Sequence, residues 1–219
     1  MRSRFDEQLS QLNADLIDMG TMIEYAIESC AGALMNMDGA LAAKIVDFDH
    51  DVDRKERDIE SLCLKLILHQ QPIARDLRFI SAALKMITDM ERIGDQAADI
   101  AEIIPFFLSH NTFDCTLVCR MAQQASSMVT QSVDAFVRRD VYLARSVAGQ
   151  DDLVDEDFTA VKQALIAAIA REPGQGEVAL DLLMIAKYFE RIGDHAVNLS
   201  EWVEFSVTGV HKHDGVEYE

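Results

Sequence analysis

The segment "ERIGDQAADIAE" at residues 91–102 returns as "ERIGDHAVNLSE" at residues 190–201. A second pair of segments, "MDGALAAKIVDFDHDVD" at 37–53 and "RDVYLARSVAGQDDLVD" at 139–155, aligns when the chain is shifted by 102 residues. The first pair needs a shift of 99, so three residues are missing from the second copy. Deletions collect in loops, so this one marks a turn between two elements. The chain is therefore predicted to be an internal duplication of about 100 residues.

Each copy is predicted to form three long helices. Ala, Leu, Ile, Met, Glu and Asp dominate the 219 residues, whereas Gly and Pro number 10 and 3, a balance that favours helices over short strands. Pro72 and Pro173 mark the turn after the second helix of each copy. Asp38 and Asp140 are suited to cap helix N-termini. Apolar periodicity places the helices at 4–36, 39–69 and 75–104, and at 114–138, 141–171 and 176–208.

The expected fold is all-α, with two tandem three-helix bundles built from six long helices. Short turns make sequential helices antiparallel. A 30-residue helix spans about 45 Å at ~1.5 Å per residue, so each bundle should be elongated. We place the first bundle at 1–107 and the second at 114–208. Residues 209–219 lack periodicity and are expected to form a mobile tail.

The net charge of the chain restricts the classes of partner that it can bind. Acidic residues number 38 against 20 basic ones, and the net charge of −18 repels nucleic-acid phosphates and anionic lipid headgroups, so neither is expected to bind directly. The N-terminal segment lacks the apolar core of a signal peptide, and no apolar run approaches the ~18 residues of a membrane span. These features predict a cytoplasmic protein. Its four cysteines should then be reduced and buried. Cys115 and Cys119, four residues apart on one predicted helix, could alternatively bind a metal ion together.

Acidic residues stand in line with the apolar stripes of two predicted helices. The stripe of the third helix recurs at spacings of three and four residues, at Leu77, Ile80, Leu84 and Ile87. The same steps lead on to Glu91 and Asp95, and the second helix similarly carries Asp49 and Asp53. Residues 49 and 95 lie about 23 residues on either side of the turn. Antiparallel packing should therefore bring the two acidic pairs face to face.

Four converging carboxylates need neutralisation. Each contact at ~5 Å costs about 3 kcal/mol at an effective dielectric constant of ~20. Protonation, multivalent cations, and pairing with basic side chains can all remove this cost; the basic candidates are Arg92, Arg191, Lys55 and Arg75. We favour the metal interpretation over salt bridges and over an acid/base dyad. Carboxylate-rich ligation suits Mg²⁺, Mn²⁺, Ca²⁺ or Fe³⁺ rather than Zn²⁺ or Cu²⁺, and His50 and His195 beside the acids are expected to lie outside the ligand set.

Glycine recurs inside both copies of the motif. Gly94 and Gly193 each cost ~1 kcal/mol relative to alanine in a helix interior, so their repetition suggests close approach by another group. The copies also differ, because Asp99 in the first is matched by Asn198 in the second. The two acidic sites are therefore expected to differ in affinity or metal count.

The sequence resembles the PhoU family of phosphate-uptake regulators, which are associated with phosphate ABC transporters. The resemblance covers nearly the whole chain and includes the duplication; it is carried by "FDEQLSQL", "DFDHDVDRKERDIE", "LHQQPIARDLR", "ALKMITDMERIGDQAADIAE" and "KYFERIGDHAVNLSE". It implies two three-helix bundles with multinuclear metal clusters, homodimers or higher oligomers, and negative regulation of the phosphate-starvation response. The implied partners are the transporter's ATPase subunit and a membrane-anchored sensor histidine kinase, so that the protein meets the inner face of the membrane only through protein partners.

The resemblance also implies the metal-binding residues. Carried over to this chain, the first cluster comprises Asp49, Asp53, Glu91 and Asp95, and the second comprises Asp151, Asp155, Glu190 and Asp194. Glu56 is a further candidate in the first half only, because Phe158 occupies the matching position of the second. The metal ions, whether Fe, Mn, Mg or Ca, are not fixed by the resemblance.

Three functional hypotheses follow. The first is a metal-binding regulatory adaptor, which is not an enzyme and couples the transporter to the kinase. The second is a carboxylate-bridged metal hydrolase or oxidase, which is disfavoured because no nucleophile, general base or glycine-rich phosphate cradle accompanies the acids. The third is a purely structural helical scaffold whose acids are solvated or paired with basic side chains.

Overall fold

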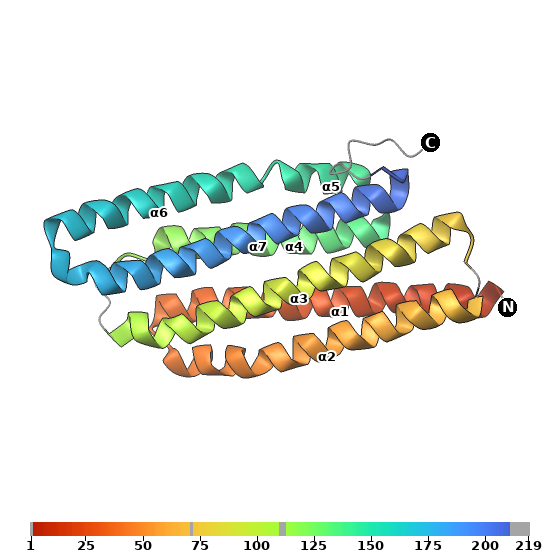
Figure 1. Cartoon of the computed structure of the whole chain (residues 1–219), viewed down its shortest axis with the longest axis horizontal. Helices are drawn as coiled ribbons and strands as arrows, with labels where there is room; N and C mark the ends of the chain where they lie inside the picture. Colours follow the sequence, from red (N-terminus) through yellow and green to blue (C-terminus); the bar gives the residue numbers. More distant parts are fainter. Residues whose placement is uncertain (1, 71, 110–112, 211–219) are drawn as a thin grey trace.

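The computed structural model describes residues 2–70, 72–109 and 113–210, and every regular element in these ranges is a helix. The helices run antiparallel along one long axis (Figure 1). Their bounds are α1 (Arg2–Asn36), α2 (Gly39–Gln70), α3 (Ala74–Ser109), α4 (Thr116–Arg138), α5 (Val141–Ala148), α6 (Asp151–Arg171), the short 3₁₀ helix η1 (Pro173–Gln175) and α7 (Gly176–Thr208). The predicted all-α fold of two three-helix units is confirmed.

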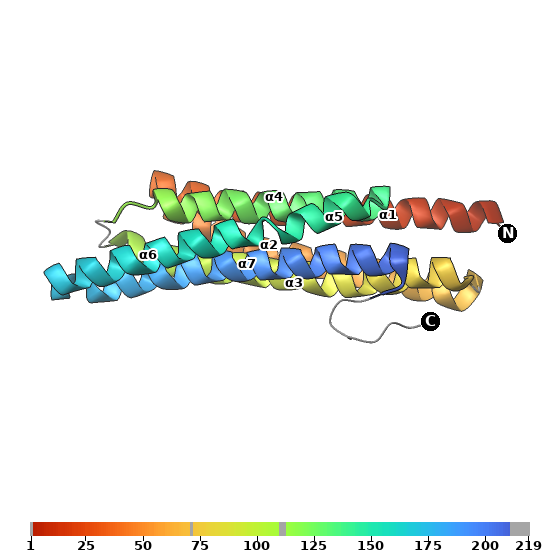
Figure 2. The ribbon, with the colours of Figure 1, turned by 90° about the horizontal axis from the view of Figure 1, so that it is seen from above.

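The two units share a central block of four helices. Helix α3 packs along α7, α1 packs along α4, and these pairs join the units (Figure 2). Helix α2 covers the outer side of the first unit, and α5 with α6 covers the outer side of the second (Figure 1). The buried side chains form one continuous hydrophobic cluster through both units. Phe79 of α3 stacks on Phe136 of α4 with ring centroids 4.4 Å apart, which carries the core across the boundary.

The predicted N-caps are confirmed in both units. The Oδ1 atom of Asp38 accepts 3.0 Å hydrogen bonds from the backbone amides two and three residues further along, and Asp140 Oδ1 does the same. Before each cap the preceding helix ends in a left-handed residue, Met37 with φ 55° or Arg139 with φ 56°. These bonds satisfy amides that have no partner within the helix, so they fix the start of the second helix of each unit.

The duplication extends to individual hydrogen bonds. Cys30 on α1 donates from Sγ to the backbone oxygen of Ala97 on α3 at 3.2 Å. At the matching positions, Ser132 on α4 donates from Oγ to the backbone oxygen of Ala196 on α7 at 3.1 Å. A thiol and a hydroxyl therefore tie the first and third helices of their units in the same way.

An ion pair between the first two helices of each unit is also repeated, with its polarity reversed. In the first unit Lys55 Nζ of α2 lies 3.2 Å from Asp18 Oδ2 of α1. In the second, Arg120 Nε of α4 donates to Asp157 Oδ2 of α6 at 2.6 Å. Exchanging helices between units would set Asp18 against Asp157 and Lys55 against Arg120. Like charges at contact distance repel, so the two pairs favour the observed helix partners.

The prediction of a single helix over 141–171 is wrong. Helix α5 ends at Ala148 and α6 begins at Asp151, with Gly149 and Gln150 between them. The interruption lets the Gln150 side chain reach α4, where its Nε2 donates to Gln131 Oε1 at 2.9 Å. Glycine weakens helix propagation at this point, and the interhelical amide pair compensates for the lost helical bonds. As a result Asp151 lies in the first turn of α6.

The third helix is longer than predicted. It was expected to end at residue 104, but α3 continues through Pro105 to Ser109. Proline costs the helix one backbone hydrogen bond. Phe107, in the added turn, is fully buried, and this burial offsets the penalty. At the other end of the chain, Gly209 closes α7 with φ 81°. The predicted tail lies beyond it, and residues 211–219 are outside the described residues; the bundle boundaries at 1–107 and 114–208 stay a prediction.

Candidate metal centre

The first acidic cluster lies between α2 and α3. One carboxylate oxygen from each of Asp49, Asp53 and Asp95 lies within 4.8 Å of the others. Residues four apart share one face of a helix, and the antiparallel α2–α3 hairpin sets the two faces against each other. Glu91 belongs to the same face but not to this set of three, and after burial the charges of Asp95, Glu56 and Asp53 raise its pKa. The predicted convergence is therefore confirmed for three of the four residues.

The packing and the charges of this cluster disfavour its ionised state. Burial raises the pKa of Asp49, and the charges of Asp53 and Asp95 raise it further. Burial and then Asp95 raise the pKa of Glu91 in the same way. Arg92 gives partial relief, because its Nη1 donates to Asp95 Oδ2 at 2.9 Å. Its own side chain is 56% exposed, so it leaves most of the repulsion in place.

A glycine faces one acid in each unit. A Cβ atom on Gly94 would lie 3.3 Å from Asp49 Oδ1, and one on Gly193 would lie 3.0 Å from Asp151 Oδ1. Both oxygens are buried, and neither accepts a hydrogen bond from any residue that the structure describes. A buried carboxylate oxygen without a donor requires a compensating partner. A cation bound by carboxylates supplies one, so the residues present fit hard metal ions.

The second acidic cluster is built differently. Its residues are Asp151 and Asp155 on α6, with Glu190 and Asp194 on α7. Burial raises the pKa of Asp151 to about 6, with further contributions from Asp194, Asp155 and Glu190. Within the described parts of the chain, however, no three of these carboxylates approach one another as closely as the first set does. The structure therefore brings the predicted residues to one place without closing them into a compact set.

The sequence predicted only some of the basic residues that pair with the two acidic clusters. Arg92 pairs with the first cluster, as the sequence suggested, whereas Lys55 pairs with Asp15 and Asp18 on α1. Among described residues, Arg75 and Arg191 form no ion pair within 4.0 Å. The sequence analysis missed Lys187, which donates from Nζ to the Glu190 carboxylate. Its spacing of three residues from Glu190 was the available signal.

The histidines and cysteines have other environments. His50 is exposed beside Asp49, and His195 donates from Nδ1 to Asp89 Oδ1 at 3.0 Å. Cys115 and Cys119 are buried, and each thiol donates to a backbone oxygen, at 3.8 and 3.7 Å. Burial is the main reason that the pKa of each thiol is raised to about 11. Metal binding requires the thiolate, so these cysteines are better suited to packing in the core than to holding a metal.

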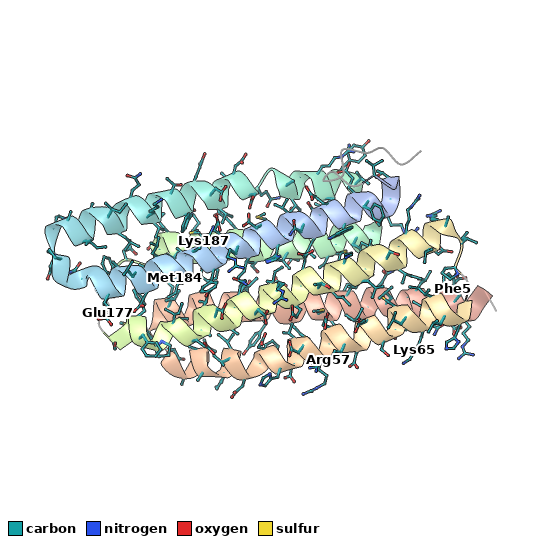
Figure 3. All side chains as sticks on the ribbon, viewed as in Figure 1. Phe5, Arg57, Lys65, Glu177, Met184 and Lys187 are labelled. Carbon is teal, nitrogen blue, oxygen red and sulfur yellow. The ribbon has the colours of Figure 1, made fainter. Side chains whose placement is uncertain are left out.

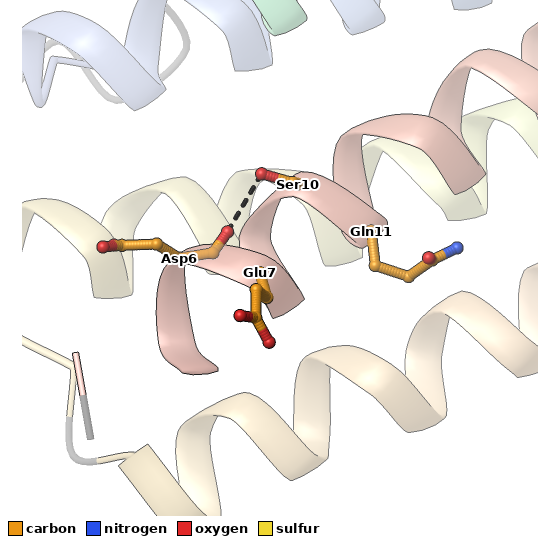
Figure 4. Close-up of a pocket in the computed structure, with 4 residues that line it drawn as sticks. All are labelled: Asp6, Glu7, Ser10 and Gln11. Carbon is orange, nitrogen blue, oxygen red and sulfur yellow. Dashed lines mark hydrogen bonds between the residues drawn. The ribbon is translucent and has the colours of Figure 1, made fainter. Parts of the chain in front are cut away.

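Two surface hollows are lined by acidic residues, and one of them lies beside the second cluster. A hollow of about 430 Å³ is lined by Asp152, Asp155, Glu156 and Thr159, so it opens beside the second cluster. Another, of about 540 Å³, lies on the first turns of α1 (Figure 4). It is lined by Asp6, Glu7, Ser10 and Gln11, and Ser10 Oγ is already bonded to the Asp6 backbone oxygen at 3.0 Å. The hollow on α1 contains none of the predicted site residues.

Replacing Asp151 with asparagine is expected to stabilise the metal-free protein at about pH 7.5 by about 1–2 kcal/mol. The pKa of Asp151 is about 6 in the fold against an ordinary 3.8, so the folded state binds the proton more tightly than the unfolded state. The free energy of unfolding therefore falls as pH rises from about 4 to about 7. The loss is smaller than the full pKa difference implies, because water reaches the half-exposed carboxylate and screens its charge. Urea denaturation in chelator at several pH values measures the difference.

The Asp151→Asn advantage should shrink towards zero below about pH 3, where the wild-type carboxyl is largely protonated in both states. Asp152→Asn is the matched control, because Asp152 is the exposed neighbour on the same helix. Equal stability of Asp151→Asn and wild type at both ends of the pH range would show that the carboxylate is not strained.

The chain matches the PhoU domain family twice, over residues 16–104 and 118–203. It is 34% identical over 210 residues to the phosphate-specific transport system accessory protein PhoU homolog of Clostridium acetobutylicum, covering 95% of this chain and 96% of that one. Its identity to the homolog of the same name in Zymomonas mobilis is 35% over 206 residues, with 94% and 87% covered.

Two solved structures share the fold at full length. The crystal structure of PhoU from Pseudomonas aeruginosa matches with a TM-score of 0.88 and 31% identity, covering 94% of this chain and all of that one. The phosphate transport system regulatory protein PhoU from Streptococcus pneumoniae matches with a TM-score of 0.87 and 25% identity, covering 94% and 98%. With both repeats matched and relatives aligned from end to end, the chain belongs to the PhoU family.

Proposed function

We propose that this protein is a metal-binding negative regulator of phosphate uptake and of the phosphate-starvation response. The names of its relatives support the transport role, because they are accessory or regulatory proteins of phosphate transport systems. None of these names describes an enzyme, and the protein acts as an accessory protein without catalysis of its own. In this proposal it is an adaptor between the ATPase subunit of a phosphate ABC transporter and a sensor histidine kinase.

The approach of Asp49, Asp53 and Asp95 carries the metal part of the proposal. Each of these residues offers a carboxylate oxygen within 4.8 Å of the other two, and carboxylate oxygens can only accept. Asp49 also has a buried oxygen, Oδ1, that receives no hydrogen bond from the described residues. When bound, metal ions neutralise the carboxylates and join the second and third helices of each unit. The residues that would hold them are Asp49, Asp53, Glu91 and Asp95 in the first unit, and Asp151, Asp155, Glu190 and Asp194 in the second.

The charge of the surface supports protein partners rather than nucleic acid. A net charge of −18 repels phosphate backbones and anionic lipids, so control of phosphate genes passes through the kinase in this proposal. None of the helices in the described ranges has the length and apolar character needed to cross a membrane. We propose a cytoplasmic homodimer that reaches the inner face of the membrane through its protein partners.

Metal binding is expected to raise the melting temperature by about 5 °C or more. A ligand at 100 times its Kd stabilises the fold by about 2.7 kcal/mol, and each kcal/mol is worth about 2–4 °C in a protein of this size. Protein stripped with chelator should be melted with and without excess Mn²⁺ or Fe²⁺, with circular dichroism as the readout. A Glu91→Ala, Asp95→Ala variant should lose part of the shift. A wild-type protein that binds no metal and shows no shift would remove metal from the proposal.

The regulatory part is tested in the host by deleting the gene. Phosphate-starvation genes are expected to stay switched on in phosphate-rich medium, and a transcriptional reporter measures this. Wild-type protein supplied in trans should restore repression. Normal repression in the deletion strain contradicts the adaptor role. Normal repression with the Glu91→Ala, Asp95→Ala variant would leave the adaptor in place and limit the cluster to structural support.

A further inference from the structure

Lys187 reaches into the second acidic cluster. It lies on α7 (labelled in Figure 3), and its Nζ donates to Glu190 while lying 5.4 Å from the ring centroid of Phe158 on α6. The Glu190 side chain is 13% exposed and the Lys187 side chain 43%, so the carboxylate is partly desolvated while the lysine stays in contact with water. Such a pair is stronger than one on an open surface. Lys187 is thus held on both sides, by a carboxylate and by an aromatic ring.

The first unit has neither of these two features. The repeat aligns Lys187 with Thr88, whose hydroxyl donates to the backbone oxygen of Leu84 on its own helix at 3.3 Å. It aligns Phe158 with Glu56, an additional acid. Each exchange makes the surroundings of the second cluster more positive by one unit of charge. Both exchanges act in the same direction.

The other differences between the units are weaker. Arg92 in the first unit lies 2.9 Å from Asp95 and 3.5 Å from Glu91, whereas Arg191 at the matching position forms no ion pair among the described residues; Arg92 is 56% exposed, so water screens its charge. Asp152 in the second unit replaces His50 in the first, which adds a negative charge, but both residues are exposed and water screens them. Desolvation raises the pKa of Asp194, and the charge of Lys187 is the main influence that lowers it. The ammonium group therefore acts on two of the four carboxylates, Glu190 and Asp194.

We propose that Lys187 is an internal counter-cation of the second cluster, so that the two clusters bind metal in order. The first cluster binds tightly, and the second binds only when the metal displaces the ammonium group from Glu190. This inference rests on the metal-binding function proposed above. The convergence of three carboxylates in the first unit, with no such set among the described residues of the second, also favours the first cluster as the tighter site.

The test is a Mn²⁺ titration of the full chain, with free Mn²⁺ followed by electron paramagnetic resonance. Asp49→Asn with Asp95→Asn removes the first cluster, so the titration reports the second alone. In that background Lys187→Thr installs the residue of the first unit and is expected to lower the Kd by about tenfold or more, because a competing positive charge is gone. Lys162→Thr removes the same charge from an exposed position of α6 and should leave the Kd unchanged.

The reciprocal change tests the first cluster. With the second cluster removed by Asp151→Asn and Asp194→Asn, Thr88→Lys is expected to raise the Kd of the first cluster by a similar factor. Circular dichroism confirms that each variant is folded. A wild-type chain that binds no Mn²⁺ overturns both the metal function and this inference. Two bound metals in the wild type, with a Kd in the Lys187→Thr variant equal to that of the Lys162→Thr control, overturn the inference alone.

Discussion

Replacing Gly94 with leucine is expected to destabilise the folded protein by about 3 kcal/mol or more. Gly94 is buried in α3, and a Cβ atom there would lie 3.0 Å from Val52 Cγ1 and 3.3 Å from Asp49 Oδ1. Leucine extends well beyond its Cβ, so α2 and α3 must move apart. The helix propensity gained by replacing glycine is about 1 kcal/mol, which is too small to offset the clash. Urea denaturation followed by circular dichroism measures the change.

Gly32 on α1 offers a matched control for Gly94. A Cβ atom at Gly32 would meet only Leu41 Cδ2, at 3.9 Å, which is ordinary contact. Gly32→Ala should therefore gain up to about 1 kcal/mol from propensity, whereas Gly94→Ala should lose stability. Val52→Ala combined with Gly94→Ala should recover part of that loss, since it removes the crowding atoms. If Gly94→Leu is as stable as wild type, the repeated glycine is incidental to the packing.

The sequence predicted the helices well because their apolar periodicity is strong. It did not predict the break at Gly149 and Gln150, because what compensates for the break is an amide pair with Gln131 on another helix. It also did not predict that α3 continues past Pro105, because this depends on the burial of Phe107 in the core. Both errors arise where a tertiary contact overrides a local preference.

The face of α3 that lines the core was only partly predicted. Of the stripe that led to the acids, Ile80 and Ile87 are buried but Leu77 is 41% exposed. The neighbouring stripe is fully buried, at Met90, Ile93, Ala97 and Ile100. The acids therefore lie at the edge of the core. Periodicity shows that a helix has apolar residues on two adjacent faces, but not that α7 of the other unit covers one of them.

The candidate site was easier to predict than its electrostatic balance. Antiparallel geometry about the α2–α3 turn was enough to bring Asp49 opposite Asp95. The rotamers of long side chains were not predictable from spacing. Lys187 could have pointed into solvent, and its contact with Phe158 on α6 is visible only in the fold. The residues that set the difference between the two clusters therefore come from the structure.

Replacing Asp89 with alanine is expected to destabilise the protein by about 2–4 kcal/mol. Asp89 on α3 accepts hydrogen bonds from three side chains of α7: His195 Nδ1 at 3.0 Å, Asn198 Nδ2 at 3.3 Å and Trp202 Nε1 at 3.2 Å. Its side chain is only 17% exposed. Alanine would remove the acceptor of all three hydrogen bonds. Each lost hydrogen bond lowers stability, because the seam between α3 and α7 is half-buried and water replaces the carboxylate only in part.

Trp202 is the single tryptophan of the chain, so its fluorescence reports directly on this seam. Asp134→Ala is the control, because Asp134 pairs with Arg138 on the same helix and both side chains are largely exposed. Its loss should be about 0.5 kcal/mol or less. Urea unfolding by fluorescence and by circular dichroism should give the same midpoint if the two units unfold together.

The repeat places a second contact on the same seam, with its partners exchanged. Asp89 aligns with Tyr188 and Asn198 aligns with Asp99, and burial and then the charge of Asp99 raise the pKa of Tyr188. The α3–α7 seam thus carries two related polar contacts, so Asp89→Ala should weaken the joint between the units without separating them. A fluorescence transition that precedes the circular dichroism transition would show that the seam opens first. A loss no larger than that of Asp134→Ala would show that water replaces the carboxylate, and that apolar packing alone holds the two units together.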